Sequence, residues 1–222
     1  SAGVNYRFMD EKGGVCCGRP LMLAGRDREA RELINHNSDI IWKSGAQILV
    51  TSCPICYKVF RESYYLDATV MHHSEFINQL IEEGSLRLGY LHRKVVYHDP
   101  CELGRGSGIY EEPRAVISYV AQLQQSSQER NMSLCCGGSL GNLTLSSEKR
   151  ALIAADAART LTISSPDELI TACPLCKKTF VQATQTKVSD IAELVAAALP
   201  KPAEKAAKRK TPRAAVKATG NG

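Results

Sequence analysis

The chain contains no apolar run of 18 or more residues, and aromatic residues make up only 6% of it. A membrane-spanning helix needs about 20 mostly apolar residues in a row, so we expect the chain itself not to span a membrane. Residues 1–4 show no basic or apolar stretch of the kind that begins a signal peptide. No flavin or nucleotide motif appears in the sequence. The isolated glycines Gly104, Gly106 and Gly108 are too weak a pattern to predict phosphate binding.

The positive charge of the chain is confined to its C-terminal stretch. The formal net charge is +5, but from Pro200 onward seven Lys and Arg residues stand against Glu204 alone. The remaining 199 residues therefore sum to −1, which argues against a basic nucleic-acid-binding face and predicts no nucleic-acid partner. Residues 200–222 lack apolar periodicity, and we expect a disordered basic tail there.

Cysteine, in contrast, is abundant: the 222 residues contain nine. An odd count with two adjacent pairs does not suit a secreted disulfide framework, since neighbouring cysteines bridge each other only with strain. Reduced thiols are typical of reducing compartments. We therefore expect the cytoplasm, or the cytoplasmic face of a membrane complex, as the location.

The nine cysteines form two sets of matched spacing. A gap of 35 residues separates Cys17 from Cys53, and a gap of 36 separates Cys136 from Cys173. Repeated thiols at fixed spacing indicate metal binding, because a metal centre tolerates little drift in its ligands. The counterpart of Cys101 would fall roughly 18 positions before Ser1, so we expect a chain cut at its front. The first set is Cys16, Cys17, Cys53 and Cys56; the second set is Cys101, Cys135, Cys136, Cys173 and Cys176.

The repeat extends to the expected secondary structure. Short apolar runs at residues 47–52 and 168–172 lead directly into the two CxxC motifs, which favours buried parallel strands. A third strand is expected at residues 94–98, before Asp99-Pro100-Cys101. Amphipathic helices precede and follow each CxxC, with Ser74 and Ser189 as expected N-caps. Alternating strands and helices predict an α/β fold with small parallel sheets flanked by helices. The expected domains are residues 1–90, 91–199 and the tail 200–222.

Several kinds of site can use such cysteines. Five thiolates exceed the four ligands of a single zinc ion, so the second set favours a multi-iron centre. The first set has four, and zinc is a rival there, although zinc ribbons usually place about 15–20 residues between two CxxC motifs. Structural thiols remain an alternative for either set. A thioredoxin-like CxxC ranks lower because it leaves the adjacent pairs unexplained.

These motifs resemble the CCG cysteine-rich domain over about residues 1–199. The resemblance rests on His98-Asp99-Pro100-Cys101, Cys16-Cys17-Gly18 and Cys135-Cys136-Gly137, with a CxxC after each adjacent pair. The family includes heterodisulfide reductase catalytic subunits and the iron–sulfur subunits of glycolate, lactate and glycerol-3-phosphate dehydrogenases. It implies two duplicated CCG domains, each binding a noncubane [4Fe–4S] cluster through five cysteines. The second set would be complete, whereas the first would need a fifth ligand outside this chain.

The resemblance implies an oxidoreductase of the heterodisulfide reductase type, in which a cluster passes electrons and cleaves a small disulfide in two one-electron steps. One alternative is an electron relay from a flavin-dependent dehydrogenase of 2-hydroxy acids or glycerol 3-phosphate toward quinone. Another is a zinc-bound interaction module. Electrons would come from a flavoprotein or ferredoxin-like subunit, within a hetero-oligomeric complex. His98, at the end of a strand, is the candidate catalytic proton donor, although a packed structural histidine is the commoner case.

Overall fold

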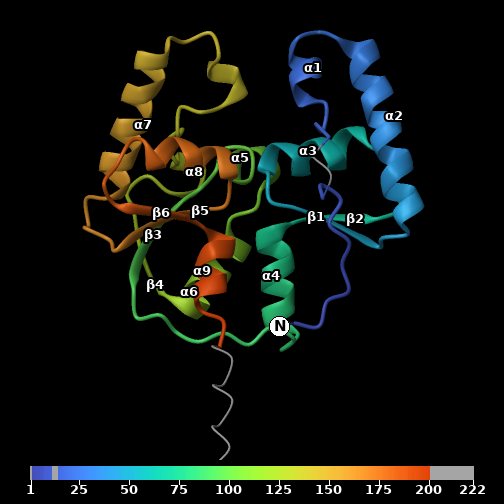
Figure 1. Ribbon diagram of the computed structural model, residues 1–222. Coiled ribbons are helices and arrows are strands. Elements are labelled where there is room, and N and C mark those ends of the chain that lie inside the picture. The colour runs from blue at the N-terminus through green and yellow to red at the C-terminus, as the bar shows by residue number, and fades with distance from the viewer. Residues whose placement is uncertain (1, 12–14, 201–222) are drawn as a thin grey trace, which may run out of the picture.

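The computed structural model describes residues 2–11 and 15–200, so the tail predicted at residues 200–222 lies outside them except for Pro200. We call the elements before residue 91 the first half and those after it the second half. Figure 1 shows the halves side by side, with the first in blue and teal and the second in green to red. The first half contains α1 (Arg19–Leu23), α2 (Asp27–Ser44), β1 (Ile48–Thr51), α3 (Pro54–Ser63), β2 (Thr69–His72) and α4 (His73–Glu82).

The second half repeats this order and adds two strands before it. The elements from α7 onward match α2 to α4 one by one, so the sequence repeat is also a structural repeat. Its elements are β3 (Lys94–His98), α5 (Gly104–Ser107), α6 (Glu111–Val120), β4 (Gln122–Gln124), α7 (Ser147–Leu161), β5 (Glu168–Thr171), α8 (Pro174–Val181), β6 (Lys187–Asp190) and α9 (Ile191–Ala197), with 3-10 turns at Arg130–Met132 and Leu140–Asn142.

Two parallel sheets organise the fold. The first half has the pair β1-β2, and the second half has the order β4-β3-β5-β6, parallel throughout. The prediction of small parallel sheets flanked by helices is therefore confirmed. The sheets also align across the repeat, because Thr51 pairs with His72 as Thr171 pairs with Asp190. Both CxxC motifs thus begin at the same end of equivalent strands, where α/β proteins place their sites.

The two strands that lead into the CxxC motifs differ in burial. All four residues of β5 are buried, since β3 and β6 pair with it on both sides. In β1 exposed residues alternate with half-buried ones, and among the described residues it pairs only with β2. The expectation of a buried strand is correct for β5 and wrong for β1.

A shared hydrophobic core joins the halves. Tyr57 and Leu86 of the first half belong to the same buried cluster as Val95, Ile117 and Ile170 of the second. Helix α4 packs on both α6 and α9, as its place in Figure 1 suggests. The seam between the halves is therefore a packed interior, and any movement of one half must be accommodated by the other.

The helices that follow β2 and β6 do not begin where expected: α4 begins two residues earlier and α9 one residue later. Ser74 and Ser189 are not the N-caps; His72 caps α4 and Asp190 caps α9, each in a capping box closed by a glutamate three residues on. Asp is a common N-cap, whereas histidine can serve only when a ring nitrogen is free to accept a hydrogen bond. His72 therefore ends β2 and begins the turn into α4, with its ring beside the residue that precedes the first CxxC.

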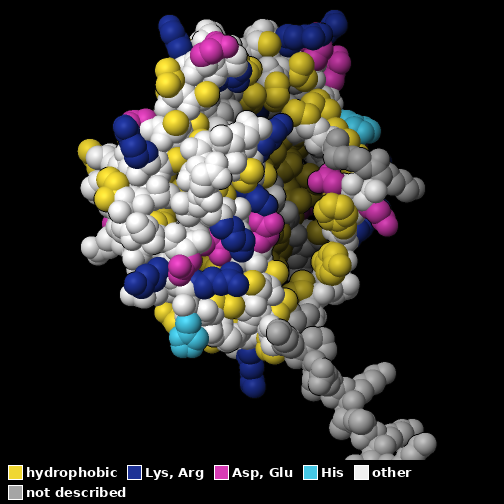
Figure 2. All heavy atoms as spheres, turned by 60° about the vertical axis from the view of Figure 1, so that its left-hand side comes forward, with side chains coloured by type: hydrophobic (Ala, Val, Ile, Leu, Met, Phe, Trp, Pro, Cys, Tyr) yellow, Lys and Arg dark blue, Asp and Glu magenta, His cyan; other side chains and the backbone are white. Residues whose placement is uncertain are grey.

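The surface carries mixed charge. On the face drawn in Figure 2, Lys and Arg side chains are interspersed with Asp and Glu, and hydrophobic side chains line a hollow. None of the helices within residues 2–11 and 15–200 combines the length and the hydropathy that crossing a bilayer requires.

Candidate metal centre

Both CxxC motifs lie at helix N-termini. Cys53 and Cys173 are the N-caps of α3 and α8, and the proline that follows each occupies the first turn. Proline suits this position because backbone N–H groups in the first turn have no acceptor within the helix, so proline loses no hydrogen bond there. The partial positive charge of a helix N-terminus stabilises thiolates. Each motif therefore presents its sulfurs at a point that favours metal-binding thiolates.

The five thiols of the second set are linked by hydrogen bonds. Bonds from the thiols of Cys101 and Cys136 lower the pKa of Cys135 to about 2. The same contact with Cys135 raises the pKa of Cys101. Cys176 lies between Cys136 and Cys173, and its contacts with both raise its pKa. The structure thus brings residues from three separate segments into one continuous group of sulfurs.

Amide groups surround this set. The backbone N–H of Gly137 donates to Cys135 Sγ at 3.4 Å, and that of Gly138 to Cys136 Sγ at 3.5 Å. Asn142 Nδ2 lies 3.6 Å from Cys135 Sγ. Such donors stabilise negative charge on sulfur and tune an iron–sulfur centre. The sequence motifs did not reveal Asn142, because its place on a 3-10 turn beyond the adjacent cysteines belongs to no spacing pattern.

The first set has the same design with a more open site. The contact with Cys56 lowers the pKa of Cys17 to about 6 and that of Cys53 to about 7. The backbone N–H of Gly18 donates to Cys16 Sγ at 3.5 Å, as Gly137 does to Cys135. Cys16 is exposed, whereas Cys17 is buried. The four thiols therefore converge, with one of them at the surface.

A small cavity lies between the first CxxC loop and the second set. It is lined by Pro54 and Ile55 from the first CxxC and by four cysteines of the second set, together with Glu102. The Cys53 thiol is also near enough to act on the pKa of Cys173. The two cysteine sets are thus neighbours across the seam. The four cysteines on the cavity wall are Cys101, Cys136, Cys173 and Cys176.

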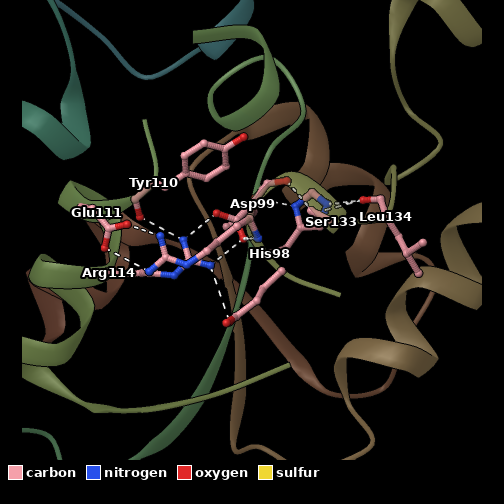
Figure 3. A network of polar contacts seen from close by, with 10 residues as sticks. His98, Asp99, Tyr110, Glu111, Arg114, Ser133 and Leu134 are labelled. Carbon is pink, nitrogen blue, oxygen red and sulfur yellow. Dashed lines mark hydrogen bonds and ion pairs between the residues drawn. The ribbon is translucent and has the colours of Figure 1, made fainter. Parts of the chain in front are cut away.

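A buried ion pair supports the segment that carries Cys101 (Figure 3). Arg114 Nη1 and Nη2 donate to the two carboxylate oxygens of Asp99 at 2.6 and 2.7 Å. Asp99 also accepts the backbone N–H of Arg130 at 2.7 Å, and its own carbonyl accepts Ser133 Oγ–H at 2.9 Å. One aspartate thereby joins the strand end before Cys101 to the loop before Cys135.

His98 is fully enclosed beside this ion pair. Its Nε2 lies 3.0 Å from the carbonyl of Leu134, and its Nδ1 lies 3.3 Å from Thr171 Oγ1. Its ring packs edge-on against Phe180, and burial lowers its pKa to about 4. With both nitrogens engaged, the neutral ring holds the residue before Cys135 in place. The proton-donor role of His98 stays a prediction.

No ready-made site for a single ion exists in the part of the chain that the structure describes: no three His, Cys, Asp or Glu side chains converge in that way. Five soft thiolates with N–H donors match the ligand chemistry of an iron–sulfur cluster.

The CCG cysteine-rich domain matches residues 2–61 and 95–181, which include all nine cysteines. The chain belongs to the CCG family. This result confirms the resemblance seen in the sequence, and the two matched segments fall in the two halves of the structure.

The curated relatives of this CCG chain are iron–sulfur and redox proteins. It is 28% identical to a subunit of the dihydromethanophenazine:CoB--CoM heterodisulfide reductase of Methanosarcina mazei, over 89% of this chain and 52% of the relative. It is 26% identical to "EtfAB:quinone oxidoreductase" of Syntrophomonas wolfei, over 87% and 30%. It is 33% identical to "Probable membrane-anchored ferredoxin" of Chromohalobacter salexigens, over 79% and 28%. The chain spans about half or less of these relatives' lengths, and it is related to iron–sulfur oxidoreductases.

The glycine after the second cysteine pair of this CCG chain allows a close approach of backbone. Gly137 has φ +81°, and a Cβ atom there would lie 2.7 Å from the carbonyl oxygen of Arg150 on α7. We expect Gly137→Ala to lower the free energy of unfolding by about 1–2 kcal/mol for the left-handed backbone, and by about 1–3 kcal/mol more for the displaced helix. Urea unfolding of the metal-free chain measures the loss.

Gly25→Ala is the matched control for this substitution. Gly25 also has a positive φ, +68°, but nothing lies within 4 Å of its Cβ position. Gly25→Ala should therefore lower the free energy of unfolding only by the cost of the left-handed backbone. Equal losses at the two glycines would mean that the close approach to α7 contributes nothing.

Proposed function

We propose that this chain is part of an iron–sulfur oxidoreductase subunit of the heterodisulfide reductase type, and that the second set holds a noncubane [4Fe–4S] cluster used in disulfide reduction. The observation that carries the proposal is the group of five linked thiols, four of which line a cavity that reaches the first CxxC. A structural zinc site takes four ligands around one ion, and the second set has one thiol more than that.

The electrostatics of the second set support a multi-iron centre. Among the thiols, Cys135 has a strongly lowered pKa while its neighbour Cys101 has a raised one, so the metal-free set does not hold five thiolates at once. Only several metal ions supply enough positive charge to deprotonate all five. The amides of Gly137 and Gly138 already point at two of the sulfurs.

For the first set we propose a second cluster held by Cys16, Cys17, Cys53 and Cys56, with zinc as the alternative occupant. The N–H···S bond of Gly18 and the lowered pKa of Cys17 and Cys53 repeat the features of the second set. In this proposal residues 1–90 and 91–199 each form one CCG domain, packed through the shared core.

The cavity marks where a disulfide would approach the second set, but its volume of about 20 Å³ holds only about one water molecule, so its wall would have to open to admit a substrate. Pro54, Ile55 and Leu175 contribute to a wall that exposes only apolar surface to the cavity. Reduction of a disulfide takes two electrons and two protons and yields two thiols. When bound, the cluster supplies single electrons and iron as a site for a substrate sulfur. The electrons come from a flavoprotein or ferredoxin-like partner subunit in a hetero-oligomeric complex.

Chemical analysis of the purified, anaerobically reconstituted chain tests the proposal. We expect a brown protein with broad visible absorption and equal amounts of iron and acid-labile sulfide, about four of each per cluster. The double variant Cys173→Ala/Cys176→Ala should lose the iron and the sulfide that the second set binds. A colourless chain with stoichiometric zinc and no sulfide would overturn the proposal.

A further inference from the structure

His72 is a buried histidine whose hydrogen bonds define its protonation. It ends β2 and caps α4, and its exposed fraction is 0%. Nδ1 accepts the backbone N–H of Ser74 at 3.4 Å and lies 2.8 Å from Ser74 Oγ. Burial lowers its pKa to about 3, so the ring is neutral. Because Nδ1 accepts, the single ring proton is on Nε2, which is a donor.

That donor faces both CxxC motifs. Nε2 lies 3.3 Å from the carbonyl of Ser52, the residue before Cys53. The backbone carbonyl of Ala172, the residue before Cys173, lies near enough to the same ring to act on its pKa, in the direction opposite to burial. One imidazole from the first half therefore contacts the peptide that leads into each CxxC, one in each half.

The neighbouring residue makes a second link across the seam. His73 Nε2 lies 3.1 Å from Asp190 Oδ1, and the same oxygen accepts the backbone N–H of Ala192 as the N-cap of α9. The rings of His72 and His73 are 4.4 Å apart. The ends of β2 and β6 are thus joined next to the point where both CxxC loops begin.

We propose that His72 is a positioning residue that couples the two cysteine sets, by fixing the Cys53 and Cys173 loops against each other through their preceding carbonyls. The proposal deepens the proposed function, because it gives the two centres a fixed relation across the cavity. A loop that moves in one half must disturb the ring that also contacts the other half.

Two substitutions separate this role from helix capping. In His72→Asn, the amide oxygen replaces Nδ1 as the cap of α4, but the side chain is too short to reach Ser52 and Ala172. In His72→Gln, the longer amide restores an N–H donor near the position of Nε2. His36→Asn, at an exposed residue of α2, is the control.

The measurement is the alkylation rate of each cysteine in the full chain without metal, followed by mass spectrometry. We expect His72→Asn to raise the rates of both Cys53 and Cys173 roughly five-fold, as for the loss of one ordinary hydrogen bond, with His72→Gln and His36→Asn near the wild-type rates. In the reconstituted chain, His72→Asn should also shift the reduction potential of the centre in the second half. A change at Cys53 alone, or at neither cysteine, overturns the coupling and leaves His72 a helix cap.

The alkylation rates are independent of the proposed function. If the wild-type chain binds no iron and sulfide, the proposed function fails while the rates still decide whether His72 couples the loops. If clusters form and only the coupling is absent, the inference fails alone.

Discussion

Replacing Arg114 with Met should lower the free energy of unfolding by about 3–5 kcal/mol, because it leaves the Asp99 carboxylate buried without its partner. The side chains of Asp99 and Arg114 are only 2% and 10% exposed, so water cannot replace the guanidinium. Methionine preserves much of the apolar stem of Arg114, which lies beside the Tyr97 ring, and so isolates the effect of the charge. For a domain with about 5–15 kcal/mol of total stability, this loss is severe.

The measurement is urea unfolding of the metal-free chain, with two further variants. Arg26→Met removes an exposed pair with Glu29, whose side chains are 59% and 36% exposed, and should cost less than about 1 kcal/mol. The double variant Asp99→Asn/Arg114→Met should be more stable than Arg114→Met alone, since no unpaired carboxylate remains. If Arg114→Met costs no more than Arg26→Met, the ion pair does not stabilise the fold.

The same variant should loosen the site. Asp99 holds the backbone N–H of Arg130, whose φ of +57° is a left-handed conformation that a non-glycine residue adopts at a cost. Without Arg114, the Asp99 contacts that join Cys101 to the loop before Cys135 lose their anchor. Stability and ligand placement therefore depend on one buried pair.

Much of the fold could be predicted because local signals agree. The strand at β3 is predicted to the residue, and the runs before the CxxC motifs become β1 and β5. The signals for β1 and β5 are strong because each apolar run leads into a Cys-Pro step, and proline begins a helix without losing a hydrogen bond. The strands β2, β4 and β6 escaped prediction, since three or four residues such as Lys187–Asp190 give too short an alternation.

The ligands of the site could be predicted from the sequence, whereas the residues that hold the ligand loops in place could not. Metal ligands repeat at fixed spacing, so the nine cysteines could be recognised as ligands from their positions in the sequence. Supporting contacts join residues that no pattern relates: Asp99 meets Arg114 in a network that also includes Arg130, and His72 meets carbonyls in both halves. The N-cap role of His72 could not be predicted either. Only the burial of the ring and the contact at Nε2 determine that Nδ1 is the nitrogen that accepts the hydrogen bond.

Replacing Cys101 with Ala should abolish the response of the second set to a disulfide while leaving a metal centre behind. The four remaining cysteines, from the adjacent pair and the CxxC, are the number that an ordinary [4Fe–4S] cluster requires. Cys101 comes from a different segment, just after the end of β3, and lines the cavity. We therefore expect iron and sulfide to be retained in Cys101→Ala. The paramagnetic signal that appears in the wild type when a disulfide is added under oxidising titration should be lost.

Cys16→Ala is the comparison, since Cys16 is the exposed thiol of the first set and does not line the cavity. It should keep the disulfide-dependent signal, whereas Cys135→Ser, in the adjacent pair of the second set, should lose it. A wild-type chain that binds clusters but responds to no disulfide would favour the electron relay over disulfide reduction. A signal that persists in Cys101→Ala would show that the fifth thiolate is not needed, because four ligands then suffice for substrate binding as well as for the cluster.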